Sequence, residues 1–401
     1  MSWLDEFDTR LAELDAAHLT RKRRVVVPES GARMTVNGRS MLAFCSNDYL
    51  GLAGHPLLKQ AVHEAVGTYG VGAGASPMVS GYSAANAALE AELAAFVQLP
   101  SALYFYAGYA TNASIVPALV GAGDAVFSDA LNHACLIDGA RLSKASIQRF
   151  DHADLGTLAA QLAASPARRK LILSDAVFSM DGDVADIAAL LALAEAHDAL
   201  LLLDDAHGFG LLGPQGRGAL AAAGLTGAAA SPRVLYMATL GKALGVAGAF
   251  VAGPERLVEW LLQKTRSYTY ATAAPALLAE ALRAALRIVG SGEGDALRAH
   301  LQALIARLRD GLSPGADAGV DAAGWSLMPS ATPIQPLVIG DNAAALLVMA
   351  GLGEAGLWVP AIRPPTVPVG TARLRIALSA AHHMEEIDLL VQSLRRLARG
   401  L

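Results

Sequence analysis

A lysine and an acid stand 38 positions apart in the chain, each just after a run of apolar residues. Asp204 ends the run Leu200–Leu203, which has the composition of a buried strand. Lys242 follows a second apolar run, Val234–Thr239, after a short turn. Because an ionised carboxylate is costly to bury unless a cation pairs with it, Asp204 needs a positively charged partner.

Pyridoxal phosphate (PLP) suits both of these residues. Its pyridinium nitrogen, kept protonated by Asp204, is the required cation, and its aldehyde forms a Schiff base with the amine of Lys242. The sequence therefore predicts a PLP enzyme that holds the acid and the lysine at the ends of two strands.

Three further polar side chains follow predicted strands and could contact the ring of the cofactor. His207 stands three residues after Asp204, at the same strand end. His133 follows the strand predicted over 125–128, where an imidazole could stack on a pyridine ring or only cap a helix. Ser179 could donate a hydrogen bond near the ring or only form a turn.

A glycine between a strand and a helix indicates where a phosphate could bind. At Gly108 and Tyr109, backbone N–H groups at the start of the helix could approach the anion, although close packing also explains the glycine. The glycines of 70–76 resemble a dinucleotide fingerprint only loosely, because no strand precedes them. This absence disfavours a nicotinamide-dependent oxidoreductase.

Two arginines near the C-terminus could bind a carboxylate. Arg373 and Arg375 lie two residues apart on a predicted strand and therefore on the same face. A guanidinium group binds a carboxylate with two hydrogen bonds, and we expect one of the two to form a surface ion pair instead. No metal is expected, because His382 and His383 have no further ligand at a suitable spacing.

The overall composition excludes several classes of function. A chain of 401 residues that is 54% hydrophobic can bury a large core. Its net charge of −5 does not suit nucleic acid as a partner. Charges such as Glu354 interrupt the apolar stretches before they reach the roughly 18 residues of a membrane span. Two cysteines and an acidic N-terminal segment favour a cytoplasmic protein without a disulfide framework or a signal peptide.

Short apolar runs alternate with helical stretches through the middle of the chain, which predicts an α/β fold with a mostly parallel, seven-stranded sheet covered by helices. Ligands bind such sheets beyond the carboxyl ends of the strands, where Asp204, His207 and Lys242 fall. The predicted strands span 102–106, 125–128, 147–150, 171–175, 200–204, 234–239 and 249–252.

We expect three parts along the chain. Residues 1–50 form an N-terminal arm with an amphipathic helix and a β-ribbon that turns at Asn37-Gly38. Residues 51–285 form the large domain that binds the cofactor, and residues 286–401 form a smaller α/β domain. The glycine-rich segment 290–294 predicts the boundary between them.

Six segments, in order, resemble the motifs of the α-oxoamine synthases, which are PLP-dependent transferases of fold type I. The resemblance covers nearly the whole chain and rests on Ser46–Gly51, Val79–Tyr82, Ser128–His133, Val177–Gly182, Asp204–Gly208 and Thr239–Lys242. The basic cluster at Arg21 and the segment Arg363–Pro368 favour the biotin-pathway members, which condense L-alanine with a pimeloyl thioester.

The resemblance implies a role for each matching residue. Lys242 binds PLP and moves the Cα proton, Asp204 pairs with the ring nitrogen, and His207 bonds the phenolic oxygen. The other implied cofactor contacts are Gly108, Tyr109, His133, Ser179, Thr239 and the partner subunit's Thr272. The implied substrate contacts are Arg21, Asn47, His133, Thr366 and Arg375, with the choice between Arg373 and Arg375 left open. The active site is thereby expected at the interface of a homodimer.

Other family members remain as alternatives. They are 2-amino-3-ketobutyrate ligase, 5-aminolevulinate synthase and serine palmitoyltransferase, which use glycine or serine and other acyl groups. Whether the pimeloyl group is carried on CoA or on acyl carrier protein also stays open. A non-catalytic binding module is disfavoured, because the lysine, the acid and both histidines are present.

Overall fold

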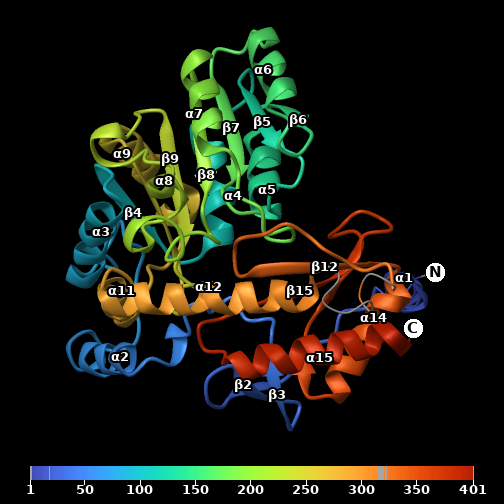
Figure 1. The fold of residues 1–401 in the computed structure, drawn as a ribbon. Coiled ribbons are helices and arrows are strands. Elements are labelled where there is room, and N and C mark those ends of the chain that lie inside the picture. The colour runs from blue at the N-terminus through green and yellow to red at the C-terminus, as the bar shows by residue number, and fades with distance from the viewer. Residues whose placement is uncertain (1, 18, 314–319, 321–322, 401) are drawn as a thin grey trace.

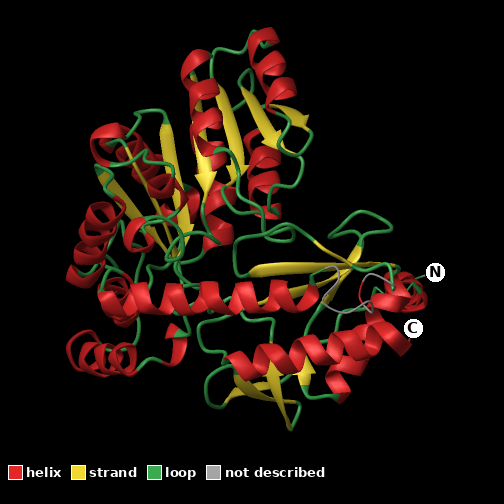
Figure 2. Ribbon diagram, viewed as in Figure 1, coloured by secondary structure: helices red, strands yellow, loops and turns green. Residues whose placement is uncertain are grey.

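Seven strands in the middle of the chain form one sheet (Figures 1 and 2). The computed structural model describes residues 2–17, 19–313, 320 and 323–400. The strands are β4 (Ser101–Phe105), β5 (Ala125–Asp129), β6 (Ser146–Phe150), β7 (Lys170–Asp175), β8 (Ala199–Asp204), β9 (Val234–Thr239) and β10 (Ala249–Gly253). Each begins and ends within one residue of its prediction.

The order of the strands across the sheet is β4-β10-β9-β8-β7-β5-β6. The five strands from β9 to β6 in that order are parallel, whereas β10 pairs antiparallel with both β9 and β4. The prediction of a mostly parallel, seven-stranded α/β sheet is therefore confirmed.

The strands are buried because their side chains alternate between two hydrophobic layers. In β8, Leu201 and Leu203 face one layer and Leu202 faces the other. The first layer is covered by α3 (Ala84–Val97), α6 (Leu155–Ala164), α7 (Ile187–Ala196), α8 (Ala219–Ala222) and α11 (Ala276–Val289), the last of which also packs on α2 (Pro56–Tyr69). The second is covered by α4 (Gly108–Leu119), α5 (Ala134–Ser143), α9 (Glu255–Lys264) and α10 (Arg266–Thr269).

Three neighbouring parallel strands end in acids at one edge of the sheet. β5 ends at Asp129, β7 at Asp175 and β8 at Asp204, and Asp175 lies in register with Asp204. Because parallel strands bring their carboxyl ends together, the loops that follow them meet at this edge. The next strand, β9, ends at Thr239 and leads through a short turn to Lys242.

The C-terminal part of the chain forms a smaller α/β unit beside the large sheet (Figure 1). Its sheet has the order β11-β12-β15-β14 and contacts α14, while α12 and α15 pack together. The elements are α12 (Gly292–Leu312), β11 (Ser326–Leu327), β12 (Ile334–Gly340), α14 (Asn342–Glu354), β14 (Ala361–Ile362), β15 (Ala372–Ala377) and α15 (Met384–Gly400). Segment 290–294 contains the turn between α11 and α12, where Ser291 caps α12 by accepting a hydrogen bond from the backbone N–H of Glu293. The division at residues 50 and 285 stays a prediction.

The N-terminal arm contains the predicted helix and ribbon. They are α1 (Trp3–Ala16), β1 (Val26–Pro28), β2 (Arg33–Val36) and β3 (Arg39–Ala43). β2 and β3 form an antiparallel hairpin, whose turn places Asn37 and Gly38 at φ of 49° and 85°. The short strand β13 (Leu357–Trp358) adds a fourth strand to this sheet by pairing in parallel with β3.

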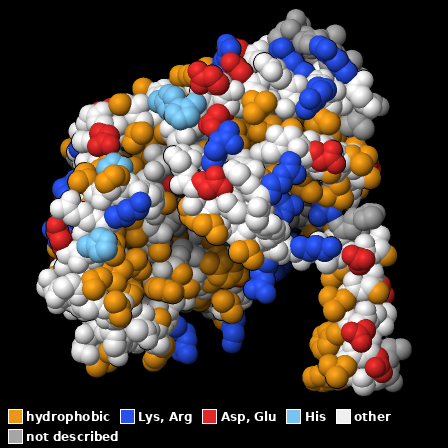
Figure 3. Space-filling view, turned by 90° about the horizontal axis from the view of Figure 1, so that it is seen from below, with side chains coloured by type: hydrophobic (Ala, Val, Ile, Leu, Met, Phe, Trp, Pro, Cys, Tyr) orange, Lys and Arg blue, Asp and Glu red, His pale blue; other side chains and the backbone are white. Residues whose placement is uncertain are grey.

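Helix α1 projects from the body of the molecule, with hydrophobic and acidic side chains along it (Figure 3). None of its described residues is buried, and Trp3 is 83% exposed. Within the described part of the chain, no helix combines the length and the apolar character that crossing a membrane requires.

Candidate functional site

A cavity of about 220 Å³ opens beyond the carboxyl ends of the parallel strands. Its lining brings together all eight residues that were predicted to contact PLP within one subunit: Gly108, Tyr109, His133, Ser179, Asp204, His207, Thr239 and Lys242. These residues come from loops that are far apart in the sequence, so the sheet topology assembles the site.

The amine of Lys242 is held by a chain of hydrogen bonds. Its Nζ lies 2.8 Å from Nε2 of His207, whose Nδ1 lies 2.7 Å from the hydroxyl of Tyr49. The Tyr49 hydroxyl in turn donates to Oδ1 of Asn47 at 3.1 Å. If His207 carries its proton on Nδ1, each of these three hydrogen bonds has one donor and one acceptor. We therefore assign this tautomer, in which Nε2 of His207 accepts a hydrogen bond from Lys242.

The pKa values of both groups are shifted towards their neutral forms. Burial lowers the pKa of Lys242 to about 8, and burial together with the charge of Lys242 lowers the pKa of His207 well below its ordinary value. A lysine of this kind has a large neutral fraction near pH 8 and can act as a nucleophile or a base.

Asp204 is a buried acid, 4% exposed, that faces the cavity. Its carboxylate accepts hydrogen bonds from Nδ2 of Asn112 and, at 2.9 Å, from the backbone N–H of Ala206. The adjacent Asp175 is also buried, and burial together with the charge of Asp204 raises the pKa of Asp175 well above its ordinary value. The shift favours the protonated form of Asp175.

His133 precedes α5 and caps this helix, which was one of the two roles considered for it from the sequence. Its Nδ1 accepts a hydrogen bond from the backbone N–H of Cys135 at 3.3 Å, which caps the helix. Its own backbone N–H donates to Asp175 at 2.9 Å. The ring also lines the cavity, so capping and a ligand contact are compatible.

The residues that line the cavity fit PLP. Lys242 can react with the aldehyde, and Asp204 can balance a cationic ring nitrogen. Helix α4 begins at Gly108 without a side-chain cap, so its first backbone N–H groups can bind a phosphate beside Thr239. The buried Oδ1 of Asn112 has no hydrogen-bond partner among the described residues, so the cavity wall offers an acceptor to a ligand.

The structure distinguishes the two arginines of β15. Arg373 is 4% exposed and is paired with the carboxylate of Asp181. Arg375 is 6% exposed and donates from Nε to the carbonyl of Ser179 at 2.6 Å, with its Nη atoms 3.4 Å from Oδ1 of Asn47. Among the described residues no carboxylate lies within ion-pair distance of Arg375, so its charge is available to a ligand.

The other predicted contacts lie outside this cavity. Thr366 lines a second cavity of about 590 Å³, which shares His133 and Ser179 with the first. Thr272 lines a separate, smaller cavity. Arg21 is exposed and does not line either of these cavities or the one that contains Lys242. The roles of these three residues stay predictions.

Four polar residues in or next to the cavity were not predicted as site residues. They are Tyr49, Asn112, Cys135 and Asp175. Asp175 could have been predicted from the sequence, since it ends an apolar run as Asp204 does. Asn112 stands four residues after Gly108, so both lie on one face of α4.

Comparisons with known proteins identify the family of the chain. The family model of aminotransferase class I and II matches residues 39–394. The chain is 71% identical to 8-amino-7-oxononanoate synthase 1 of Polaromonas sp. (strain JS666 / ATCC BAA-500), covering 99% of this chain and 97% of the relative. It is 68% identical to 8-amino-7-oxononanoate synthase of Delftia acidovorans (strain DSM 14801 / SPH-1), covering 99% and 98%.

A solved structure of SPT with a PLP internal aldimine is similar over the whole fold. The TM-score is 0.89 at 27% identity, and the match covers 100% of this chain and 99% of that chain. The chain thus has the fold type I architecture and takes PLP as its cofactor. It belongs to the aminotransferase class I and II family and, among its PLP-dependent acyl-transferring members, to the family of 8-amino-7-oxononanoate synthases.

Proposed function

We propose that the protein condenses L-alanine with a pimeloyl thioester to give 8-amino-7-oxononanoate, CO₂ and the free thiol of the carrier. The names of relatives that are 68–71% identical over nearly the whole chain support this reaction. The observation that carries the proposal is a lysine with a pKa of about 8, held beside a neutral histidine in a cavity that also contains a buried acid. In the net reaction the Cα–carboxyl bond of alanine and the carbon–sulfur bond of the thioester break, and a bond from Cα to the acyl carbon forms. The proton first removed from Cα is replaced by another after CO₂ leaves, and the departing thiolate takes up a proton.

When bound, PLP withdraws electrons from the Cα of the amino acid. Asp204 keeps the ring nitrogen protonated, because a buried carboxylate stabilises a cation beside it. Lys242, freed as a neutral amine, removes the Cα proton as a general base. His207, held by Tyr49, orients the amine and would hydrogen-bond the phenolic oxygen of the bound cofactor.

We assign the carboxylate of alanine to Arg375. Its guanidinium group is buried, is held in place by Ser179 and Asn47, and has no competing acid among the described side chains. The charge of Arg375 also lowers the pKa of Lys242, which places the two groups within electrostatic reach of each other. Asn47, at the centre of these contacts, would orient Arg375 towards the substrate.

We assign the pimeloyl chain to the cavity that contains Thr366. Its lining is largely apolar and includes Phe178, Val367 and Pro368. It shares His133 and Ser179 with the cofactor cavity, so a thioester carbon at the junction would be close to the reacting Cα. A methylene chain buried in this cavity contributes about 0.8 kcal/mol for each CH₂.

We further propose that the enzyme is a homodimer. Thr272 lines a cavity separate from that of Lys242, as expected if it serves the site of the partner subunit. The large apolar side chains of α1, including Trp3 and Phe7, are exposed in the single chain and would gain from burial at an interface.

The test is an amino-acid and thioester panel. Alanine, glycine and serine are each mixed with pimeloyl-CoA, pimeloyl acyl carrier protein, acetyl-CoA, succinyl-CoA or palmitoyl-CoA. Thiol release is followed with a chromogenic disulfide, and the product is identified by mass spectrometry. We expect product only from alanine with a pimeloyl thioester. Preferred turnover of glycine or serine with another thioester would instead assign one of the related condensations.

A further inference from the structure

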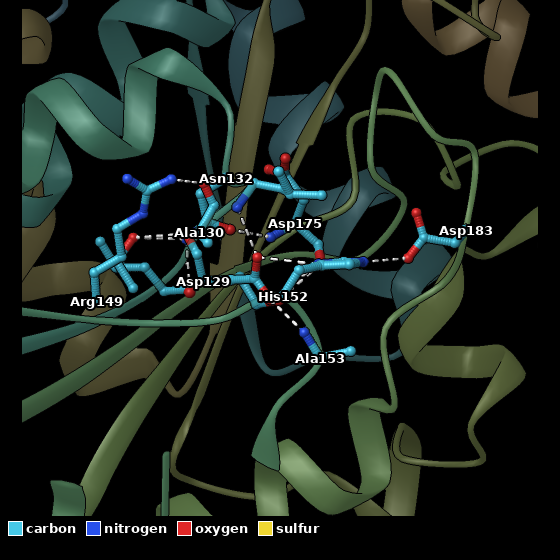
Figure 4. A network of polar contacts seen from close by, with 12 residues as sticks. Asp129, Ala130, Asn132, Arg149, His152, Ala153, Asp175 and Asp183 are labelled. Carbon is cyan, nitrogen blue, oxygen red and sulfur yellow. Dashed lines mark hydrogen bonds and ion pairs between the residues drawn. The ribbon is translucent and has the colours of Figure 1, made fainter. Parts of the chain in front are cut away.

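His152 connects two loops that line the cavity (Figure 4). It follows β6, and its ring lies between the carboxylates of Asp129 and Asp183. Nδ1 is 3.1 Å from Oδ1 of Asp129, and Nε2 is 2.9 Å from Oδ2 of Asp183. The ring also packs edge-on against Phe178, with centroids 4.3 Å apart.

The ring of His152 must be cationic to make both contacts. A carboxylate only accepts hydrogen bonds, so each ring nitrogen needs its own proton. The hydrogen bonds to Asp129 and then to Asp183 raise the pKa of His152 to about 10. The Asp129 side chain is 4% exposed, so the imidazolium also balances a buried negative charge.

The Asp129 end of this bridge holds the turn that delivers His133. The Asp129 carboxylate accepts a bond from the backbone N–H of Leu131 at 2.8 Å. The side chain of the next residue, Asn132, accepts from the backbone N–H of Asp175 at 2.9 Å (Figure 4). The Asp175 carboxylate accepts from the backbone N–H of His133 at 2.9 Å. A shift of Asp129 would therefore move His133.

The Asp183 end holds the loop that delivers Ser179. The backbone N–H of Phe178 donates to the carbonyl of Asp183 at 3.0 Å, and Val177 pairs with Val184 across the base of the loop. The carbonyl of Ser179 accepts from Arg375 at 2.6 Å. The position of Asp183 is thus transmitted to Ser179 and to Arg375.

We propose that His152 is a positioning residue of the active site. By joining Asp129 to Asp183 it fixes the separation of the two loops, and so places His133 and Ser179 on the cofactor and the substrate. The inference rests on the proposed function, because it takes this cavity as the site of reaction.

The experiment compares His152→Gln with His55→Gln. Gln can make one of the two hydrogen bonds but carries no charge. His55 is the matched control, because it also pairs with an acid, Glu293, at 3.2 Å and caps α2 through the backbone N–H of Leu57. Three quantities are measured: the melting temperature of the apoprotein, the visible circular dichroism of bound PLP, and kcat/KM for alanine.

We expect both variants to lower the melting temperature. Only His152→Gln should alter the circular dichroism of bound PLP and lower kcat/KM, by about tenfold to a hundredfold, since a displacement of about 1 Å can cost that much. If the two variants behave alike in dichroism and kcat/KM, His152 is merely structural and the inference is wrong.

A second variant keeps the test valid should His152→Gln not fold. Asp183→Asn leaves the contact between His152 and Asp129 intact, and we expect it to change the same two readouts in the same direction by a smaller factor. Unchanged dichroism and kcat/KM in Asp183→Asn would overturn the inference. The dichroism needs no turnover, so a wild-type protein that binds PLP but makes no 8-amino-7-oxononanoate contradicts the proposed function separately.

Discussion

Nζ of Lys242 lies 2.8 Å from Nε2 of His207, and burial lowers the pKa of both groups. The positive charge of Arg375 contributes to both pKa shifts, after burial. The group proposed to bind the carboxylate of the substrate therefore also helps to keep the lysine deprotonated. A bound carboxylate would weaken that influence, so substrate binding raises the basicity of Lys242 just when a base is needed.

The pH dependence of PLP binding tests the pKa of Lys242. Only the neutral amine attacks the aldehyde, and its fraction rises with pH up to the pKa. We expect the rate at which the apoprotein forms the Schiff base to rise with pH and to level off above pH about 8. An ordinary lysine would give a rate that keeps rising to about pH 10.4.

Stopped-flow absorbance in the visible range measures this rate. In the control variant Lys242→Ala, the visible absorbance band of the Schiff base should not form. Lys264→Ala changes an exposed lysine on α9 and should match the wild type. A rate still increasing at pH 10 would show that Lys242 is not perturbed.

Replacing Asp204 tests the electronic role of the buried acid. If Asp204 pairs with the ring nitrogen as proposed, Asp204→Asn removes that anionic partner, and we expect the exchange of the alanine Cα proton with deuterated water to slow about a hundredfold to a thousandfold. Proton NMR of alanine follows this exchange without any acyl donor.

The neighbouring Asp205 is the matched control. It is fully buried, but its carboxylate accepts from the Tyr236 hydroxyl at 2.6 Å and from the backbone N–H of Ala219 at 2.7 Å, away from the cavity. Asp205→Asn should destabilise the protein by about 1–3 kcal/mol and leave the exchange rate of the folded fraction nearly unchanged. Equal slowing in both variants would contradict the assignment.

Replacing either arginine of β15 by lysine should have a different effect, on KM for Arg375 and on the melting temperature for Arg373. Arg375→Lys would remove the bidentate contact that we propose with the substrate carboxylate, so KM for alanine should rise about tenfold to a hundredfold. Arg373→Lys breaks a buried pair with Asp181 and should mainly lower the melting temperature. Steady-state kinetics at saturating pimeloyl thioester measure both, and a larger KM effect in Arg373→Lys would reverse the roles.

Mixed dimers test whether the site spans two subunits. Lys242→Ala and Thr272→Glu should each be inactive, the second because its carboxylate repels the phosphate of the neighbouring site. After the two are unfolded and refolded together, on the order of a quarter of the sites contain neither substitution if the dimer is two-fold symmetric. Recovery of about that share of activity supports a shared site, and no recovery places Thr272 outside it.

The sequence predicted the strands and the cofactor cavity well because both depend on local patterns. The apolar runs that end at Asp175, Asp204 and Thr239 are strongly marked, and their loops carry the reactive groups. The distinction between Arg373 and Arg375 needed the fold, because it depends on which side chain meets Asp181 from a distant loop.

Other contacts left little local signal. Strand β13 has two residues and exists only because β3 lies beside it. Tyr49 belongs to a matched segment, but its contact with His207 joins residues 158 positions apart. The contacts of His152 likewise form only because β5, β6 and β7 lie next to one another in the sheet.

The arm's sheet is built from the two extremes of the chain. Residues 26–43 supply three of its strands, and the fourth, β13, comes from residues 357–358, more than 300 positions later. During translation the ribosome therefore releases the early ribbon long before its last strand exists. A polypeptide that stops short of residue 357 leaves the edge of β3 uncovered and open to pairing with another chain.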